Sequence, residues 1–350
     1  MKLNLAQISA ITLGAARIEE IDNDIHFYRF TKEQEVLYQQ RTLALKHKDD
    51  FYLKTFSTSG VQMRFRTNSQ SLFLNVDVAE STTRKYFSVE VTVNGERIGA
   101  IKNFAEEELE GNYTKWPFPL GNFSKAFDLG AGEKEVRIYL PWSVIMTLKE
   151  MSLDDGAFIT PIKPNKQLLC FGDSISHGYD VLYPSNKYLT KLADLLGAEE
   201  HNKAIGGEIY FPDLAKTKED FEPDYIIVEY GSNDWSLCSR EEMTSNCGAF
   251  LANVSKTYPN AKIFASTPIW RKDMHEGKPF GDFMLLGGII QEQAAGLENI
   301  SVIQGFEFVP PDETLFADLM LHPSDKGFEY FVENLSKGIK AAAGDEIFVE

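Results

Sequence analysis

The chain of 350 residues contains only three cysteines, Cys170, Cys238 and Cys247. Three thiols make neither a disulfide framework nor a CxxC metal motif, so we expect reduced thiols and a cytoplasmic location. Positive charge is also scarce: 35 Lys and Arg stand against 52 Asp and Glu, a net charge of −17. An acidic surface repels phosphate groups, which argues against nucleic acid and membrane surfaces as partners.

Long hydrophobic runs and metal motifs are absent from the sequence. No stretch approaches the roughly 20 apolar residues of a membrane span. The N-terminal stretch is interrupted by Asn4, Gln7 and Ser9, so we interpret it as part of a folded domain rather than as a secretion signal. The six histidines include no HExxH or HxH pattern, and we expect neither a metal nor another cofactor.

Short segments with period-two alternation fill the first half of the chain. They are rich in β-branched and aromatic residues, and Asn94-Gly95 between two of them is a strong hairpin signal. The segments include IHFYRF (25–30), FYLKTF (51–56), VQMRFR (61–66), SLFLNVDV (71–78) and YFSVEVTV (86–93). This pattern predicts an N-terminal β-sandwich domain, jelly-roll-like, over residues 1–158.

The pattern changes after the proline-containing segment ITPIKPNKQ (159–167), which we interpret as a linker. From there, five apolar strand segments alternate with helical segments. Alternation of this kind predicts an α/β domain over residues 159–350, with a parallel five-stranded sheet covered by helices on both faces.

Small and reactive residues follow the strands of this second half, where parallel strands place their carboxyl ends at one edge. The clusters are Gly172-Asp173-Ser174, Gly206-Gly207, Asn233-Asp234, and Asp318 with His322. Each alone suits a helix cap or a turn, but together they suit acyl transfer. His322 can take the proton of Ser174, and Asp318 can orient the imidazole. The N–H groups of Ser174 and Gly207 and the amide of Asn233 can stabilise an oxyanion.

Four segments carry a family resemblance: FGDSISHG (171–178), AIGGE (204–208), YGSNDW (230–235) and LHPSDKG (321–327). In this order they resemble the four blocks of the SGNH (GDSL-type) hydrolases, and the resemblance covers about residues 165–342. It implies a flavodoxin-like domain that hydrolyses esters. It also implies Ser174 as nucleophile and oxyanion donor, Gly207 and Asn233 as further donors, and His322 as base.

The acid of the triad departs from the family pattern. The family places it three residues before the histidine, where this chain has Leu319, and Asp318 stands four residues before. Either Asp318 or a backbone carbonyl therefore orients His322. A GxSxG elbow, typical of the α/β-hydrolases, is absent.

Three further side chains are candidates for substrate binding. His177 lies three residues after Ser174, and we interpret it as a pocket-wall or a structural residue. Trp235 and Trp270 follow the third and fourth strands, so they are expected to line the same crevice. Aromatic walls suit sugar rings or acyl chains, although plain packing explains the tryptophans nearly as well.

The arrangement of a β-rich half before an SGNH half resembles the two-domain carbohydrate esterases that remove acetyl groups from polysaccharides. It implies hydrolysis of short acyl groups on a small acylated carbohydrate. The alternatives are a lipase or thioesterase of the same fold and a non-catalytic carbohydrate-binding protein.

Overall fold

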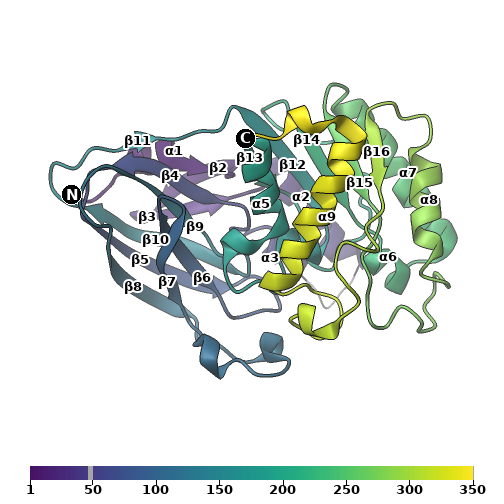
Figure 1. Ribbon diagram of the computed structural model, residues 1–350, viewed down its shortest axis with the longest axis horizontal. Coiled ribbons are helices and arrows are strands. Elements are labelled where there is room, and N and C mark those ends of the chain that lie inside the picture. Colours follow the sequence, from purple (N-terminus) through teal and green to yellow (C-terminus); the bar gives the residue numbers. More distant parts are fainter. Residues whose placement is uncertain (46–49, 350) are drawn as a thin grey trace.

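The structure is a computed structural model that describes residues 1–45 and 50–349. Two antiparallel sheets form the N-terminal half, at the left of Figure 1, and a parallel sheet covered by helices forms the C-terminal half at the right. The N-terminus lies at the far end of the antiparallel sheets.

The two antiparallel sheets pack around one apolar core, to which strands of both contribute. One sheet has the order β2 (Arg17–Ile21), β3 (Asp24–Tyr28), β10 (Val144–Leu153), β5 (Ser71–Glu80) and β8 (Gly121–Asp128). The other has the order β1 (Thr12–Leu13), β4 (Gln62–Thr67), β9 (Lys134–Tyr139), β6 (Ser88–Val93) and β7 (Glu96–Lys102), with β11 (Thr160–Pro161) beside β4. The predicted sandwich is confirmed, whereas its jelly-roll form and the boundary at residue 158 stay predictions.

The hairpin between β6 and β7 forms where the sequence indicates it. Asn94 has φ 50° and Gly95 has φ 87°, and positive values at both central residues are typical of a type I′ turn. By contrast, the strand prediction for residues 51–56 was wrong. Asp50 accepts a hydrogen bond from the backbone N–H of Leu53, and this cap begins the short helix α3 (Phe51–Lys54).

The parallel sheet has the order β13 (Ala198–Asn202), β12 (Lys166–Gly172), β14 (Tyr225–Glu229), β15 (Lys262–Ser266) and β16 (Ile300–Ile303). Numbered within this half, the order is 2-1-3-4-5, and all four strand pairs are parallel. This is the flavodoxin-like arrangement, so the predicted fold of the C-terminal half is confirmed. The order reverses between β12 and β14, and both strands end where the candidate residues begin.

Helices cover both faces of the parallel sheet. α5 (Tyr188–Leu196) and α9 (Asp325–Ala343) pack on one face, while α7 (Arg240–Thr257) and α8 (Leu285–Ala294) pack on the other. Two short helices, α4 (Ser174–His177) and α6 (Ser232–Leu237), begin directly after β12 and β14. Within the described residues, no helix has both the length and the apolar character needed to span a membrane.

The two halves of the chain share their apolar cores. Phe30 and Tyr38, the latter from α2 (Lys32–Leu45), join the core under α7 and α8, and Tyr86 and Trp142 join the core under α5 and α9. α1 (Leu5–Ile11) stays with the antiparallel sheets. Because the N-terminal half packs against both faces of the parallel sheet, its side chains reach the loops at the strand ends.

Candidate active site

The loop after β12 places Ser174 at the start of a helix. Asp173 caps that helix by accepting the backbone N–H of Ile175 at 2.9 Å. Gly172 has no room for a Cβ, which would lie 2.8 Å from the Glu229 carbonyl oxygen and 2.6 Å from Ser176 Oγ. The strand therefore turns sharply into α4, and Ser174 keeps 5% of its surface exposed.

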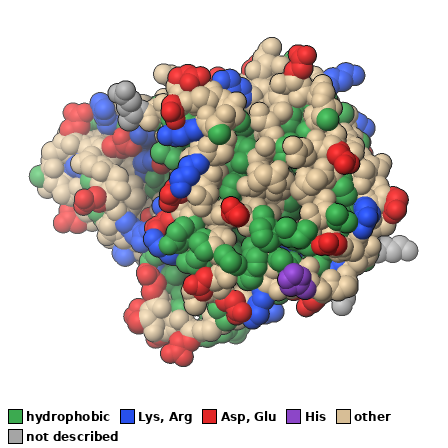
Figure 2. Space-filling model, turned by 45° about the vertical axis from the view of Figure 1, so that its right-hand side comes forward, with side chains coloured by type: hydrophobic (Ala, Val, Ile, Leu, Met, Phe, Trp, Pro, Cys, Tyr) green, Lys and Arg blue, Asp and Glu red, His purple; other side chains and the backbone are tan. Residues whose placement is uncertain are grey.

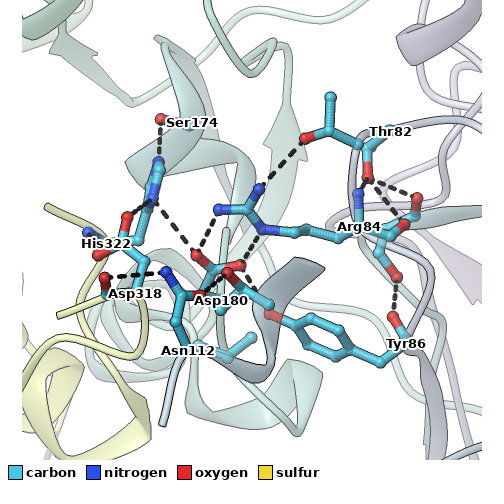
Figure 3. Close-up of polar contacts among 12 residues, drawn as sticks. Thr82, Arg84, Tyr86, Asn112, Ser174, Asp180, Asp318 and His322 are labelled. Carbon is cyan, nitrogen blue, oxygen red and sulfur yellow. Dashed lines mark hydrogen bonds and ion pairs between the residues drawn. The ribbon is translucent and has the colours of Figure 1, made fainter. Parts of the chain in front are cut away.

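Ser174, His322 and Asp318 form one continuous hydrogen-bonded chain (Figure 3). His322 Nε2 lies 2.8 Å from Ser174 Oγ, and His322 Nδ1 lies 2.6 Å from Asp318 Oδ2. This geometry lets the imidazole take the hydroxyl proton while the carboxylate holds the proton on Nδ1. The structure thus brings these three predicted residues together, although their separation in sequence reaches 148 residues.

The one-residue departure from the family spacing is absorbed by Leu319. Its φ of 60° lies in the left-handed region, which lets the chain turn back after Asp318. Asp318 Oδ1 accepts the backbone N–H groups of Met320, Leu321 and His322 at 3.0, 2.8 and 3.0 Å. The carboxylate is therefore locked by its own loop, and Oδ2 is left to face the imidazole.

The electrostatics of this hydrogen-bonded chain favour an ion pair between His322 and Asp318 once the imidazole takes a proton. Burial would raise the pKa of Asp318, but His322 and the backbone N–H groups outweigh it and hold that pKa far below its usual range. Burial likewise opposes a charge on His322, but Asp318 and Asp180 outweigh it and raise the pKa of the imidazole. A base of raised pKa is well suited to hold the proton of Ser174 during attack.

The candidate oxyanion donors lie in the first turns of α4 and α6 and in the turn after β13. Gly207 has φ 88°, a conformation that favours glycine, in the turn after β13. Within residues 1–45 and 50–349, the backbone N–H groups of Ser174 and Gly207 have no hydrogen-bond acceptor. Asn233 Nδ2 lies 3.0 Å from the Glu208 carbonyl oxygen and 3.3 Å from Asp173 Oδ2, so Asn233 joins the three strand ends.

Of the two predicted roles of His177, pocket wall or structural residue, the structure favours the second, because the side chain is fully buried. Its Nδ1 accepts the backbone N–H of Gly206 at 3.2 Å, and its Nε2 lies 3.0 Å from the Trp142 carbonyl oxygen and 2.9 Å from Ser57 Oγ. Burial lowers the pKa of this imidazole, which keeps it neutral. His177 therefore supports the turn that carries Gly207 and ties it to the N-terminal half.

The two tryptophans, Trp235 and Trp270, differ in their exposure to solvent. Trp235 is fully buried, donates its indole N–H to the Gly281 carbonyl oxygen at 2.8 Å and packs against Phe283, so it offers no surface to a substrate. Trp270 is partly exposed and packs against Phe316, with ring centroids 5.2 Å apart, just before the Asp318 loop. The prediction that Trp270 contacts substrate stays a prediction.

Two carboxyl groups at the site, those of Asp180 and Glu229, belong to no motif that the sequence shows. Asp180, six residues after Ser174, lies with Oδ2 3.3 Å from His322 Nδ1. Glu229, at the end of β14, is buried against Asp173, and burial raises the pKa of both carboxyl groups, that of Glu229 more strongly. Both contacts join residues from separate elements, and neither has a characteristic spacing that could have indicated it.

The described residues contain one group of side chains able to hold a metal ion: Asp180, Asp318 and His322. All three are already engaged with one another, and Arg84 neutralises Asp180. A metal ion on Nδ1 would displace the proton that Ser174 activation requires, so this group fits the proton-transfer chain better than a metal centre.

A cavity of about 620 Å³ adjoins the site at Asp318. Its lining is mainly charged or titratable, with two apolar side chains: Lys272, Asp273, His275, Glu276 and Asp318, with Leu319 and Met320. The backbone N–H of Lys272 donates to the Met320 carbonyl oxygen at 3.0 Å, which joins the two loops that form the cavity. The cavity therefore adjoins the site through Asp318 and its loop.

Comparison with known families and structures agrees with this geometry. Residues 170–330 match the model of the GDSL-like lipase/acylhydrolase family, which confirms the resemblance seen in the sequence motifs. No curated protein matches the chain.

Three solved structures resemble nearly the whole chain. A salicylyl-acyltransferase, SsfX3, from a tetracycline biosynthetic pathway has a TM-score of 0.76 at 19% identity and covers 95% of this chain and 94% of its own. A putative GDSL-like lipase from Bacteroides ovatus has a TM-score of 0.75 at 18% identity and covers 100% of this chain and 98% of its own. A family two carbohydrate esterase from Cellvibrio japonicus has a TM-score of 0.64 at 15% identity, and the alignment covers 97% of each chain. At these identities the likeness shows a common fold that includes both halves of the chain.

Proposed function

We propose that the protein, whose residues 170–330 match the GDSL-like lipase/acylhydrolase family, is a serine esterase that removes short acyl groups, acetyl above all, from a small carbohydrate. The observation that carries this proposal is the continuous chain from Ser174 Oγ through His322 to Asp318, with contacts of 2.8 and 2.6 Å. Such a chain activates a hydroxyl that is otherwise a weak nucleophile.

The proposed reaction has two steps. Ser174 Oγ attacks the ester carbonyl and His322 takes the hydroxyl proton, while the N–H groups of Ser174 and Gly207 and the amide of Asn233 stabilise the oxyanion. His322 then gives its proton to the leaving sugar oxygen, which leaves an acyl group on Ser174. Water, deprotonated by His322, hydrolyses this acyl-enzyme and restores the serine.

The cavity beside Asp318, which has both charged and apolar side chains in its lining, supports a carbohydrate substrate. Its charged side chains offer hydrogen-bond partners for hydroxyl groups, and Leu319 and Met320 offer apolar surface to a sugar ring or a short acyl group. The whole-chain likeness to a carbohydrate esterase supports the same choice. Hydrophobic side chains also gather on one face of the molecule (Figure 2). The whole-chain likeness to an acyltransferase makes transfer of the acyl group to an acceptor other than water the second candidate function.

A comparison of p-nitrophenyl acetate with longer acyl esters tests the reaction class. Activity confined to acetate supports the proposal, a preference for long chains supports a lipase or thioesterase, and no activity supports a non-catalytic binding protein. Acetate release from acetylated xylan, mannan and cello-oligosaccharides then identifies the carbohydrate. Loss of the acyl group to an added alcohol faster than to water would favour the transferase.

Replacing Asn233 by alanine is expected to lower kcat by roughly 10² to 10³, the usual cost of losing one oxyanion donor. The KM should change little, because this donor acts mainly on the charge that develops during attack. Steady-state kinetics with p-nitrophenyl acetate measure both constants. A change in KM alone would make Asn233 a residue that binds the ground state instead.

The pH dependence should reflect the raised pKa of His322. Only a neutral imidazole can take the proton of Ser174, so kcat/KM should rise with pH and reach half its plateau above 6.5, the ordinary histidine value. A pH–rate profile of the free enzyme reports this midpoint. A midpoint at or below 6.5 would contradict the electrostatic account of the site.

A further inference from the structure

Asp180 occupies a position that the proposed triad does not use. Its Oδ2 lies 3.3 Å from His322 Nδ1, beside the Asp318 oxygen that lies 2.6 Å from the same nitrogen. Two carboxylates therefore face one imidazole nitrogen, one from the loop after α4 and one from the loop before α9. Figure 3 shows Asp180 between His322 and Arg84.

The N-terminal half of the chain holds this carboxylate in place. Arg84 donates Nε to Asp180 Oδ1 at 2.7 Å and Nη2 to Oδ2 at 2.8 Å, and the Tyr86 hydroxyl donates to Oδ1 at 2.6 Å. Arg84 and Tyr86 lie in the segment between β5 and β6 of the antiparallel sheets. A bidentate guanidinium contact fixes both the position and the plane of the carboxylate.

Asp180 is maintained despite two costs to the folded state. Its side chain is fully buried, and its backbone has φ 99°, a conformation that side chains other than glycine rarely adopt. Strained backbones of this kind are typical of functional sites, where the surrounding structure forces them. The preceding residue, Tyr179, packs its ring 5.5 Å from that of His322, so the same turn contacts both the edge and the face of the imidazole.

The charges of Asp318, Asp180, Arg84 and the imidazole balance when the imidazole is protonated. Asp318 and Asp180 supply two negative charges and Arg84 supplies one positive charge, which leaves one negative charge for an imidazolium. Tyr86, Tyr113 and Tyr179 are the tyrosines that interact with Asp180, and burial raises the pKa of each, so they stay neutral. Asp173 is the further carboxyl group that interacts with His322.

We propose that Asp180 is a second positioning carboxylate for His322, and that the N-terminal half completes the active site by holding it through Arg84 and Tyr86. Asp180 restrains the ring from the side that Asp318 leaves open and adds to the stability of the imidazolium. Arg84 in turn limits that contribution. The proposal rests on the proposed function, since it assigns a role in the same proton transfer.

Charge-removing variants test this role through the pH profile of kcat/KM. In Asp180→Asn, loss of a negative charge should lower the pKa of His322 and move the acid limb down by about one pH unit, the low end for a charge at this distance. In Arg84→Met, the uncompensated Asp180 should move the limb upward. The double variant Asp180→Asn/Arg84→Met should return the limb close to that of the wild type.

The matched control is Asp194→Asn. Asp194 also forms a bidentate pair with an arginine of the N-terminal half, since Arg137 donates to its two oxygens at 2.6 and 3.0 Å across β9 and α5. This variant loosens the contact between the halves without touching His322, so the acid limb should stay in place. If Arg84→Met fails to fold, Asp180→Asn and the double variant still test the proposal. Asp180→Asn should move the acid limb down, and removing Arg84 as well should move it back up.

A purely structural role for Asp180 would lower the plateau and the melting temperature but leave the acid limb unmoved. Unmoved limbs in Asp180→Asn and Arg84→Met, or shifts in the same direction, would overturn the proposal. An NMR titration of the His322 imidazole in the same variants measures the shifts without turnover. If no ester is hydrolysed, the proposed function fails, while the titration still decides the place of Asp180.

Discussion

Ser174→Ala is expected to lower kcat for p-nitrophenyl acetate by about 10⁶-fold, the scale seen when a serine nucleophile is removed from a triad. The methyl group cannot form the acyl-enzyme, and His322 loses the hydroxyl that lies 2.8 Å from its Nε2. The backbone N–H groups of residues 174 and 207 remain, so a residual rate above that of water should persist. The loss of one oxygen from a side chain at the rim of the sheet should leave the melting temperature nearly unchanged.

Ser185→Ala serves as the control for this substitution. Ser185 lies before α5, where its hydroxyl bonds to Glu90 at 2.8 Å, and it has no place in the proposed reaction. Its kcat should stay within a few-fold of the wild type, because its hydrogen bonds are to Glu90 rather than to Ser174, His322 or Asp318. Turnover by folded Ser174→Ala that comes within tenfold of the wild type would reject Ser174 as the nucleophile.

Asp318→Asn is expected to lower kcat by about 10⁴-fold, the cost of the same change in a serine protease triad. The reason lies in the loop. Three backbone N–H groups bond to Oδ1 of Asp318, so the amide oxygen of the variant will take that place and turn its NH₂ toward His322. An NH₂ group can only donate, so it favours the tautomer with the proton on Nε2, which cannot accept the proton of Ser174.

Asp318→Ala separates this tautomer effect from the loss of the carboxylate. Alanine donates nothing to Nδ1, so Asp180 Oδ2 remains as an acceptor for the Nδ1 proton. We therefore expect the alanine variant to retain more activity than the asparagine variant, with kcat measured on folded protein in both cases. A loss below tenfold in Asp318→Asn would show that Asp318 is not the group that orients His322, and would leave Asp180 Oδ2, 3.3 Å from Nδ1, as the acceptor.

The chemistry at the strand ends could be predicted from the sequence because it depends on local rules. Parallel strands end at one edge, so motifs that follow successive strands must meet there. Ser174, Gly207, Asn233 and His322 were expected together on this basis, and the strand pairs are parallel, as the argument requires. The sandwich and the Asn94-Gly95 hairpin likewise follow from period-two patterns and a turn that requires positive φ.

Other features depend on contacts that no local pattern encodes. The segment 51–56 alternates like a strand, but the cap by Asp50 makes its first residues helical. Trp235 follows a strand in the same way as Asn233, yet its ring turns into the core beside Phe283. Whether a side chain faces the crevice or the core is decided by the packing of neighbouring helices, which spacing alone does not specify.

The sequence by itself determined which residue types stand at the carboxyl edge of the sheet, because strand periodicity and chain order are local properties. Only the tertiary structure decided what surrounds His322. The turn at Leu319 lets Asp318 reach the imidazole across a longer spacing, and Arg84 brings a charge from 96 residues earlier in the chain to the carboxylate of Asp180. Charges interact through space over several ångströms whatever their separation in sequence, so the electrostatics of this site exist only after the two halves pack together.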